Sequence, residues 1–211
     1  MKISVSFTKF KENQKKTIEA INQTDADYLH IDLMDGKFVN NKQQLPNEIN
    51  KLLPYIKKPL DVHLMAEDPL KYLDFFANLN TDYFVVHLEI NQDINHIYNE
   101  VSKRGLRFGL AINPETDIKE IEPIISLLDQ VLIMSVNPGA GGSSFMPEVL
   151  SKIKKLKELK EEYNYQYLIN VDGGVNDETI NLVKESGADM VVSGSYICLS
   201  DDMQGSIDSL R

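Results

Sequence analysis

Short apolar segments alternate with amphipathic segments along the whole chain. The segments between several apolar runs repeat apolar residues at helical spacing, as in Leu70, Leu73 and Phe76. Eight apolar runs have the length and composition of buried strands: Ile3–Phe7, Tyr28–Leu33, Leu60–Met65, Tyr83–His87, Arg107–Ile112, Gln130–Val136, Tyr167–Val171 and Met190–Ser193. Strands that alternate with helices form parallel sheets, and eight such units predict closure into a barrel. We therefore expect one (β/α)₈ barrel domain over residues 1–211, with its last helix inside Asp201–Arg211. A doubly wound open sheet is the alternative.

Composition narrows the classes of function. The 211 residues include 42% hydrophobic residues, enough for a full core, and carry a net charge of −10. Nucleic-acid binding is not expected, because it needs clustered Lys and Arg, and the basic run Lys152–Lys160 has the spacing of a solvated helix face. We find no apolar run near the ~20 residues of a membrane span, no secretory leader, and only one cysteine, Cys198. We expect a cytoplasmic protein with no membrane partner, and a homo-oligomer remains open.

Four polar residues lie at the ends of three predicted strands. His30 and Asp32 share one strand face because strand side chains alternate, His63 lies near the end of another strand, and Asp172 ends a third. Any one of them could simply cap a strand or bond loop backbone. In (β/α)₈ barrels, however, residues at the carboxyl ends of strands form the active site, so four together favour a site.

These four side chains suit a particular chemistry. Two imidazoles and two carboxylates form a nitrogen and oxygen ligand set for one divalent zinc, iron, manganese or cobalt ion, with room for substrate oxygens. Asp32 and Asp172 also suit an epimerase, which removes a proton from one face of a carbon and returns one to the other. A metal between them would stabilise the enediolate.

Three methionines fall close to the same strand ends. Met34, Met65 and Met134 could form a soft, uncharged wall beside a planar intermediate. Filling of the core explains them equally well, so they are tentative members of the pocket wall.

Glycine-rich turns follow the last three predicted strands. The turn before the helix that starts near Pro147 contains Gly139, Ala140, Gly141 and Gly142. Gly173 and Gly174 follow Asp172, and the last strand ends at Gly194 and Ser195. Such turns expose backbone N–H groups that bind anions, and barrels often bind phosphate after their last strands. They predict a barrel of the phosphate-binding type, although its chain is acidic.

Several motifs resemble those of the ribulose-phosphate 3-epimerase family. HIDLMDGKFVNN (30–41) is similar to the family signature HxDxMDGxFVPN, and DVHLM (61–65) is similar to a second one. The remaining matches occur in order along the chain: VHLE (86–89), AINPET (111–116), LIMSVNPGAGG (132–142), VDGGV (171–175) and GADMVVSGS (187–195). The resemblance covers nearly the whole chain. It implies a metal-dependent barrel that interconverts D-ribulose 5-phosphate and D-xylulose 5-phosphate in the pentose phosphate pathway.

The resemblance also implies a role for individual residues. It places the metal ligands at His30, Asp32, His63 and Asp172, and the acid and base at Asp32 and Asp172. The substrate contacts implied are Ser6, His63, Gly139, Ala140, Gly141, Gly142, Asp172, Gly173, Gly174, Gly194 and Ser195. Ser6 is the one residue of this set that only the resemblance suggests.

Around the expected substrate position the chain departs from the family pattern, although every residue that the resemblance implies as a metal ligand is present. Lys37 stands where the family usually has His, Asn40 where it has Pro, Ala140 where it has an aromatic residue, and Ser143 where it has Gln. The first strand reads VSFT (5–8) instead of PSIL. A 3-epimerase of a hexulose 6-phosphate such as D-allulose 6-phosphate is therefore an alternative. A catalytically silent sugar-phosphate binder is less favoured, and residues 32–37 do not fit the DxKxxD run of related aldolases and decarboxylases.

Overall fold

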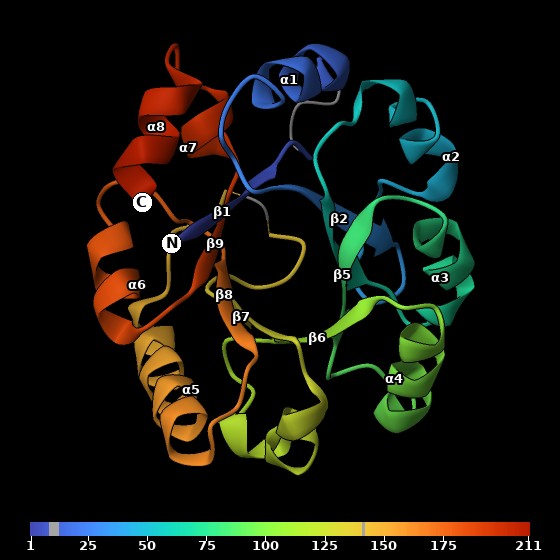
Figure 1. Cartoon of the computed structure of the whole chain (residues 1–211), viewed down its shortest axis with the longest axis vertical. Helices are drawn as coiled ribbons and strands as arrows, with labels where there is room; N and C mark the ends of the chain where they lie inside the picture. Colours follow the sequence, from blue (N-terminus) through green and yellow to red (C-terminus); the bar gives the residue numbers. More distant parts are fainter. Residues whose placement is uncertain (9–12, 141) are drawn as a thin grey trace.

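A closed barrel of eight parallel strands forms the centre of the protein (Figure 1). The computed structural model describes residues 1–8, 13–140 and 142–211. The barrel strands are β1 (Lys2–Ser6), β2 (Tyr28–Asp35), β4 (Leu60–Met65), β5 (Thr81–His87), β6 (Arg107–Ile112), β7 (Gln130–Met134), β8 (Leu168–Asp172) and β9 (Met190–Ser193). The first strand, β1, pairs in parallel with both β9 and β2, which closes the ring. The predicted (β/α)₈ barrel is confirmed, and the open sheet is excluded.

Strand bounds follow the apolar pattern closely. Three predicted strands, Leu60–Met65, Arg107–Ile112 and Met190–Ser193, have the bounds that the structure shows. Three strands depart by two residues: β5 begins at Thr81, β7 ends at Met134, and β2 continues to Asp35 because the short antiparallel strand β3 (Lys42–Gln43) pairs with its end. Two residues are too short to show an alternating pattern, so the sequence did not predict β3.

Helices surround the barrel (Figure 1). They are α1 (Gln14–Ile21), α2 (Pro46–Ile49), α3 (Leu70–Ala77), α4 (Ile94–Lys103), α5 (Leu150–Tyr163), α6 (Ile180–Ser186), α7 (Ser195–Cys198) and α8 (Met203–Leu210). Four 3₁₀ segments complete the set: η1 (Leu53–Tyr55), η2 (Ile118–Glu120), η3 (Glu122–Leu127) and η4 (Pro147–Val149). Between β6 and β7 the chain forms the 3₁₀ segments η2 and η3 in place of an α-helix. None of the described helices is both long and apolar enough to cross a membrane.

Two lysines of the basic run do not lie on a solvated helix face: Lys160 donates to the Asp189 carboxylate at 2.7 Å, and Lys152 contacts a neighbouring loop. The Lys152 ammonium donates hydrogen bonds to the carbonyl oxygens of Asn113, Pro114 and Thr116, in the loop after β6. The expectation of a fully solvated face was wrong at these two positions, because helical spacing shows which side of a helix is polar but not what that side meets.

The barrel interior contains both an apolar cluster and a set of buried polar side chains. An apolar cluster that includes Tyr28, Tyr83 and Met190 fills one part of it. Fully buried polar side chains occupy the next inward-facing positions of the strands: Ser4, His30, Asp61, Gln130 and Asn170. A separate and larger apolar core lies between the strands and the helices. Alternation along each strand therefore separates a helix-facing apolar surface from a partly polar interior.

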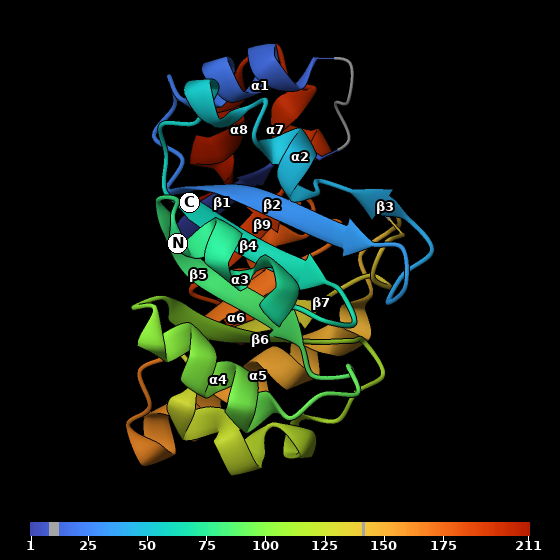
Figure 2. The ribbon, with the colours of Figure 1, turned by 90° about the vertical axis from the view of Figure 1, so that its right-hand side faces the viewer.

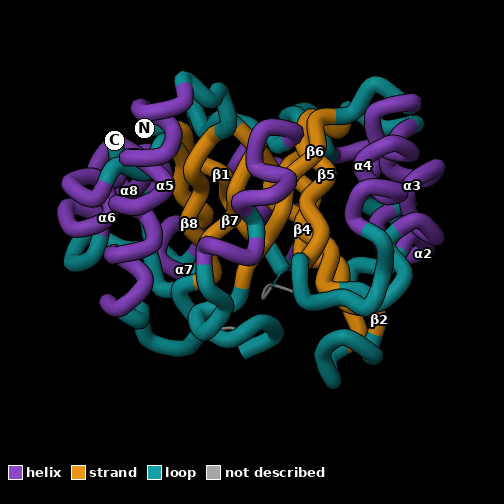
Figure 3. The backbone as a smooth tube through the Cα atoms, turned by 90° about the horizontal axis from the view of Figure 1, so that it is seen from below, coloured by secondary structure: helices purple, strands orange, loops and turns teal. Residues whose placement is uncertain are grey.

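The carboxyl ends of the strands all face the same side of the molecule (Figure 2). Both termini lie at the opposite side, near the upper edge of Figure 3, while the end of β2 lies at the lower edge. The Arg211 guanidinium donates to the Met1 carbonyl at 3.3 Å and to the Asp27 carboxylate at 3.1 Å, which ties the two ends of the chain together. Residues at the strand ends are thus brought together at one mouth of the barrel.

Candidate functional site

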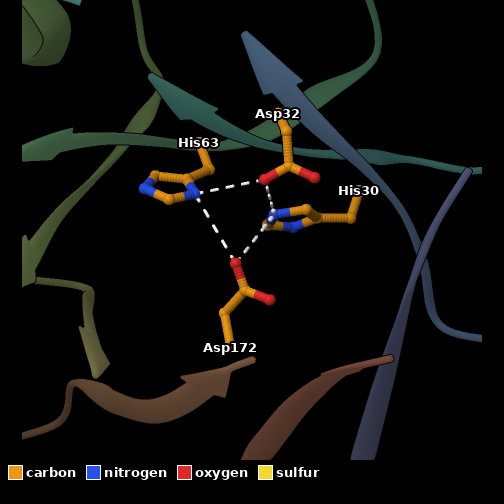
Figure 4. Close-up of side chains that lie close together, drawn as sticks. All are labelled: His30, Asp32, His63 and Asp172. Atoms are coloured by element: carbon orange, nitrogen blue, oxygen red, sulfur yellow. Dashed lines mark hydrogen bonds and ion pairs between the residues drawn. The ribbon is translucent and has the colours of Figure 1, made fainter. Parts of the chain in front are cut away.

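Four side chains converge at the carboxyl end of the barrel (Figure 4). His30 Nε2 lies 3.2 Å from Asp32 Oδ1 and 3.9 Å from Asp172 Oδ2. His63 Nδ1 lies 3.3 Å and 3.7 Å from the same two oxygens. Asp32 and Asp172 point toward one another with the imidazoles between them (Figure 4). The structure therefore brings together all four residues that the sequence pointed to.

Strand register explains why these residues meet. In the β2–β4 pair, Asp32 lies beside His63, and His30 lies beside Asp61. Asp172 is the last residue of β8, and the Ser135 hydroxyl donates to the Asp172 and Gly173 carbonyls at 2.9 and 2.6 Å. These bonds hold the end of β8 against the loop that follows β7.

A buried carboxylate orients His30. Asp61 Oδ2 lies 2.7 Å from His30 Nδ1 and accepts a hydrogen bond from the Ser4 hydroxyl at 3.0 Å. The Gln130 amide donates to the other Asp61 oxygen at 3.4 Å. Because an ionised carboxylate only accepts, His30 donates through Nδ1 and presents Nε2 to the site.

Two hydroxyl groups hold Asp32. Ser6 and Thr8 both donate to Asp32 Oδ2, at 2.8 and 2.9 Å, which leaves Oδ1 beside the imidazoles. Gln44 Oε1 accepts from the Asp32 backbone N–H at 2.8 Å. Sequence reasoning missed Thr8 and Gln44. The VSFT departure contained the only signal for Thr8, since it places a hydroxyl where the family usually has leucine.

The charges in the cluster shift one another's pKa values. Burial lowers the pKa of His30, but the carboxylates of Asp32 and Asp61 outweigh it and raise that pKa well above its usual value. Burial opposes ionisation of Asp32 too, yet the charge and hydrogen bond of His30 hold the pKa of Asp32 well below the usual range. For Asp172, burial and repulsion from Asp32 together raise the pKa. The two carboxylates therefore differ in their hold on a proton.

The geometry of the cluster fits one divalent ion. One ligand atom from each of the four residues lies within 4.8 Å of all the others. A tetrahedral ion with bonds of about 2.1 Å needs ligand atoms roughly 3.4 Å apart. The observed separations of 3.2, 3.3, 3.7 and 3.9 Å lie close to that value. These residues could hold a metal ion, and the donor set is one that zinc, iron, manganese and cobalt share.

A cavity of about 730 Å³ opens beside the cluster. Ser6, Thr8, Asp32 and Asp172 line its floor together with Met34, Met65 and Met134, so the three methionines do reach the pocket wall. Its rim includes Gly139, Ala140, Gly142, Gly173, Gly174, Gly194 and Ser195. Gly141 lies outside the described residues. His63 is fully buried and is not among the residues that line the cavity.

The predicted substrate loop is joined to the β2–β3 loop. The Asn41 amide donates to the Gly139 carbonyl at 2.8 Å, and the Val39 side chain lies within 3.1 Å of the position of a Gly139 Cβ. Two of the departures from the family pattern are exposed here: Ala140 lines the cavity, whereas Lys37 lines a separate hollow beside Asp68.

Comparison with known proteins places this site in a family. The sequence profile described as "Ribulose-phosphate 3 epimerase family" matches residues 2–198. The chain belongs to the ribulose-phosphate 3-epimerase family. It is 39% identical to ribulose-phosphate 3-epimerase of Helicobacter pylori strain J99 over 93% of this chain and 89% of that protein. It is 40% identical to the Bacillus subtilis strain 168 protein of that name, over 92% of this chain and 90% of the relative. The protein is therefore an enzyme, an epimerase.

Solved structures with similar folds are more distant. A mutant tryptophan synthase alpha-subunit from Pyrococcus furiosus superposes with a TM-score of 0.70 at 15% identity, over 99% of this chain and 96% of that one. Thiamine phosphate pyrophosphorylase from the same organism gives 0.66 at 14% identity, over 100% and 93%. These similarities support the barrel fold alone.

The raised pKa of Asp172 predicts a pH-dependent stability effect. Above that pKa the buried carboxylate is ionised next to Asp32 and destabilises the fold, so a neutral Asn should relieve this cost. In chelated protein at pH 8, Asp172→Asn should increase the free energy of unfolding by about 1–3 kcal/mol. The gain should shrink as the pH falls through the raised pKa and vanish below the unfolded-state value of about 3.9.

Urea unfolding at several pH values measures this effect. Asp177→Asn is the control, because Asp177 is exposed and makes the same change in charge. If the chelated Asp172→Asn protein is less stable than wild type at pH 8, ionised Asp172 does not destabilise the fold.

Proposed function

We propose that this protein interconverts D-ribulose 5-phosphate and D-xylulose 5-phosphate by proton transfer at C3. The observation that carries the proposal is the pair of carboxylates, Asp32 and Asp172, which face each other across the two imidazoles at the cavity floor. A planar enediolate lying between them would have one carboxylate on each side. Family membership and the names of the relatives support the same reaction.

The positions of the oxygens suggest which atoms move the proton. Asp32 Oδ1 and Asp172 Oδ2 lie beside the imidazole nitrogens, so the other oxygen of each group is the better proton carrier. In the direction from ribulose 5-phosphate, Asp32 takes the C3 proton through Oδ2, where the proton replaces the Ser6 hydrogen bond as that hydroxyl turns to Thr8 Oγ1, 3.1 Å away, and Asp172 delivers a proton to the opposite face. The Ser6 and Thr8 hydroxyls stabilise the ionised Asp32 that starts this cycle. The roles exchange in the reverse direction.

A divalent ion would complete the site. His30, Asp32, His63 and Asp172 would hold it, and it would act as a Lewis acid that stabilises negative charge on the substrate's oxygens. The three methionines would exclude water around the planar intermediate while adding no charge of their own. The glycines at the rim would leave backbone N–H groups open to the phosphate.

A direct assay with chelation tests the reaction and the metal together. We expect epimerisation of ribulose 5-phosphate, loss of turnover after exhaustive chelation, and recovery with a stoichiometric divalent ion found by elemental analysis. His63→Ala should lose metal and activity together. Allulose 6-phosphate should react at least ~10-fold less efficiently, since one additional carbon is typically discriminated by that much.

Each alternative has its own result in this assay. Preference for allulose 6-phosphate would assign the enzyme to hexulose phosphates. Binding of both sugars without turnover would make it a silent binder. Full activity in metal-free protein would contradict the metal-dependent proposal.

The phosphate pocket is tested at Gly142. This glycine has a φ of +90°, so Gly142→Val adds bulk and also forces a backbone geometry that valine rarely adopts. We expect KM for ribulose 5-phosphate to rise by more than ~10-fold, the cost of a hydrogen bond to a charged group. Lys37→Ala should change KM by less than ~5-fold, because an exposed ion pair contributes little.

Two further measurements make this comparison specific. Inorganic phosphate should inhibit wild type competitively and the Gly142→Val protein only weakly, while metal content stays unchanged in both. Equal effects of the two substitutions on KM would mean that a lysine holds the phosphate.

A further inference from the structure

The mechanism above leaves one group of buried polar residues unused. His63 Nε2, on the far side of the ring from the site, lies 2.8 Å from His87 Nε2. His87 Nδ1 lies 3.0 Å from Glu89 Oε2. His87 is the last residue of β5, and Glu89 follows it in the next loop. A continuous chain of hydrogen-bonding atoms therefore leads from the cluster of Figure 4 into the neighbouring strand.

Glu89 is the fixed end of this chain. Its Oε1 accepts from the Asn113 backbone N–H at 2.7 Å and from the Thr116 hydroxyl at 2.5 Å. The Lys152 ammonium donates to the carbonyls of the same loop, which holds that loop in place. Burial acts to raise the pKa of Glu89, but its hydrogen bonds lower it to about 2, so the group stays an ionised acceptor.

The position of each proton follows from Glu89. An ionised carboxylate only accepts, so His87 Nδ1 must donate to it. A neutral His87 then has a lone pair on Nε2, which must accept from His63 Nε2–H. His63 is left with its lone pair on Nδ1, the nitrogen that faces Asp32 and Asp172.

The surroundings of His87 leave few other arrangements. Both His63 and His87 are fully buried. The Phe38 ring lies over His87 with centroids 4.6 Å apart, and the His63 ring lies 4.9 Å away on a similar tilt. Packing of this kind keeps the rings from turning and limits access of water to their nitrogens.

We propose that Glu89 and His87 are positioning residues that hold His63 in its Nε2–H tautomer and so make Nδ1 the metal-binding atom. The proposal rests on the metal site proposed above. It explains why the two histidines offer opposite nitrogens: Asp61 contacts His30 directly at Nδ1, whereas the carboxylate that controls His63 acts at Nε2 through a second imidazole. Partners of this kind typically change metal affinity by about 10–100-fold.

The tautomer can be measured without any metal or substrate. In ¹⁵N-histidine NMR of the chelated wild-type protein, His63 and His87 should each show one protonated and one unprotonated nitrogen. His63 should be protonated at Nε2 and His87 at Nδ1. A His63 that is protonated at Nδ1, or that averages between both forms, overturns the proposal even if the enzyme is fully active.

Substitutions at His87 separate hydrogen bonding from packing. His87→Phe keeps an aromatic ring against Phe38 but removes the acceptor, and we expect metal affinity to fall by about 10–100-fold in a chelator competition. His87→Gln keeps an acceptor oxygen and should restore most of that affinity. If the two variants lose affinity equally, or neither loses any, the relay does not control the metal.

Glu89→Gln tests the far end of the relay. A Gln amide can donate as well as accept, so the single tautomer of His63 should become a mixture in the NMR spectrum. Glu115→Gln, at an exposed position in the same loop region, makes the same change in charge and should leave the spectrum unchanged. An unchanged His63 tautomer in Glu89→Gln would overturn the proposal.

These outcomes are distinct from failure of the proposed function. A wild-type protein that binds no divalent ion but keeps the single His63 tautomer would contradict the metal-dependent mechanism while supporting the relay. Tight metal binding in the His87→Phe protein would contradict the relay while leaving the metal-dependent mechanism intact.

Discussion

Pairing of β1 with β2 closes the barrel, and the site depends on that closure. The register Ser6 to His30 brings the Ser6 hydroxyl to Asp32 and joins β1 to β2, while β1 pairs with β9 on its other side. Only in a closed ring can β8 deliver Asp172 to the residues of β2 and β4, because its own partners in the sheet are β7 and β9. Parallel strands place their carboxyl ends at one mouth, and alternation turns every second side chain inward. Two simple rules of sheet geometry thus assemble the two imidazoles and two carboxylates.

Closure also buries polar groups, and those that contact His30, Asp32 and His63 are hydrogen-bonded, whereas the buried Asn170 amide has no partner within the described part of the chain. A buried polar atom without a hydrogen bond costs several kcal/mol, up to roughly 7 in the least favourable surroundings. His30 bonds to Asp61, Asp32 bonds to Ser6 and Thr8, and His63 bonds to His87. These contacts link neighbouring units of the barrel, so the same bonds that offset burial also fix the direction of the ligand atoms of His30, Asp32 and His63. The opposite shifts in the pKa values of Asp32 and Asp172 arise from the same close packing of buried charges. A two-base epimerase needs one group that removes a proton from the substrate and a second group that returns one.

Much of this arrangement could be predicted from the sequence. The eight apolar runs were enough to predict the barrel. The two-residue alternation in HID predicted that His30 and Asp32 share a strand face, and the strand-end positions of DVHLM and VDGG pointed to His63 and Asp172. The supporting residues could not be predicted in the same way, because their partners depend on register and rotamer. His87 reaches His63 across 24 residues of chain, and Thr8 reaches Asp32 across 24 residues as well. Lys152 looked like one more solvated lysine, yet it holds a loop of the neighbouring unit. The strand β3 was missed because two residues cannot show a period.

Exchange of the C3 proton with solvent tests the central claim most directly, since it observes one carboxylate at a time. In deuterated water, with metal content verified, Asp172→Asn should incorporate deuterium at C3 of ribulose 5-phosphate without forming xylulose 5-phosphate, because Asp32 still removes the proton. Asp32→Asn should show the mirror result, with deuterium entering xylulose 5-phosphate and no ribulose 5-phosphate formed. Each variant should lose turnover by about 10²–10⁴-fold. Epimerisation by Asp172→Asn at near the wild-type rate, or no exchange in either variant while the metal is bound, would contradict the assignment of Asp32 and Asp172 as the two bases.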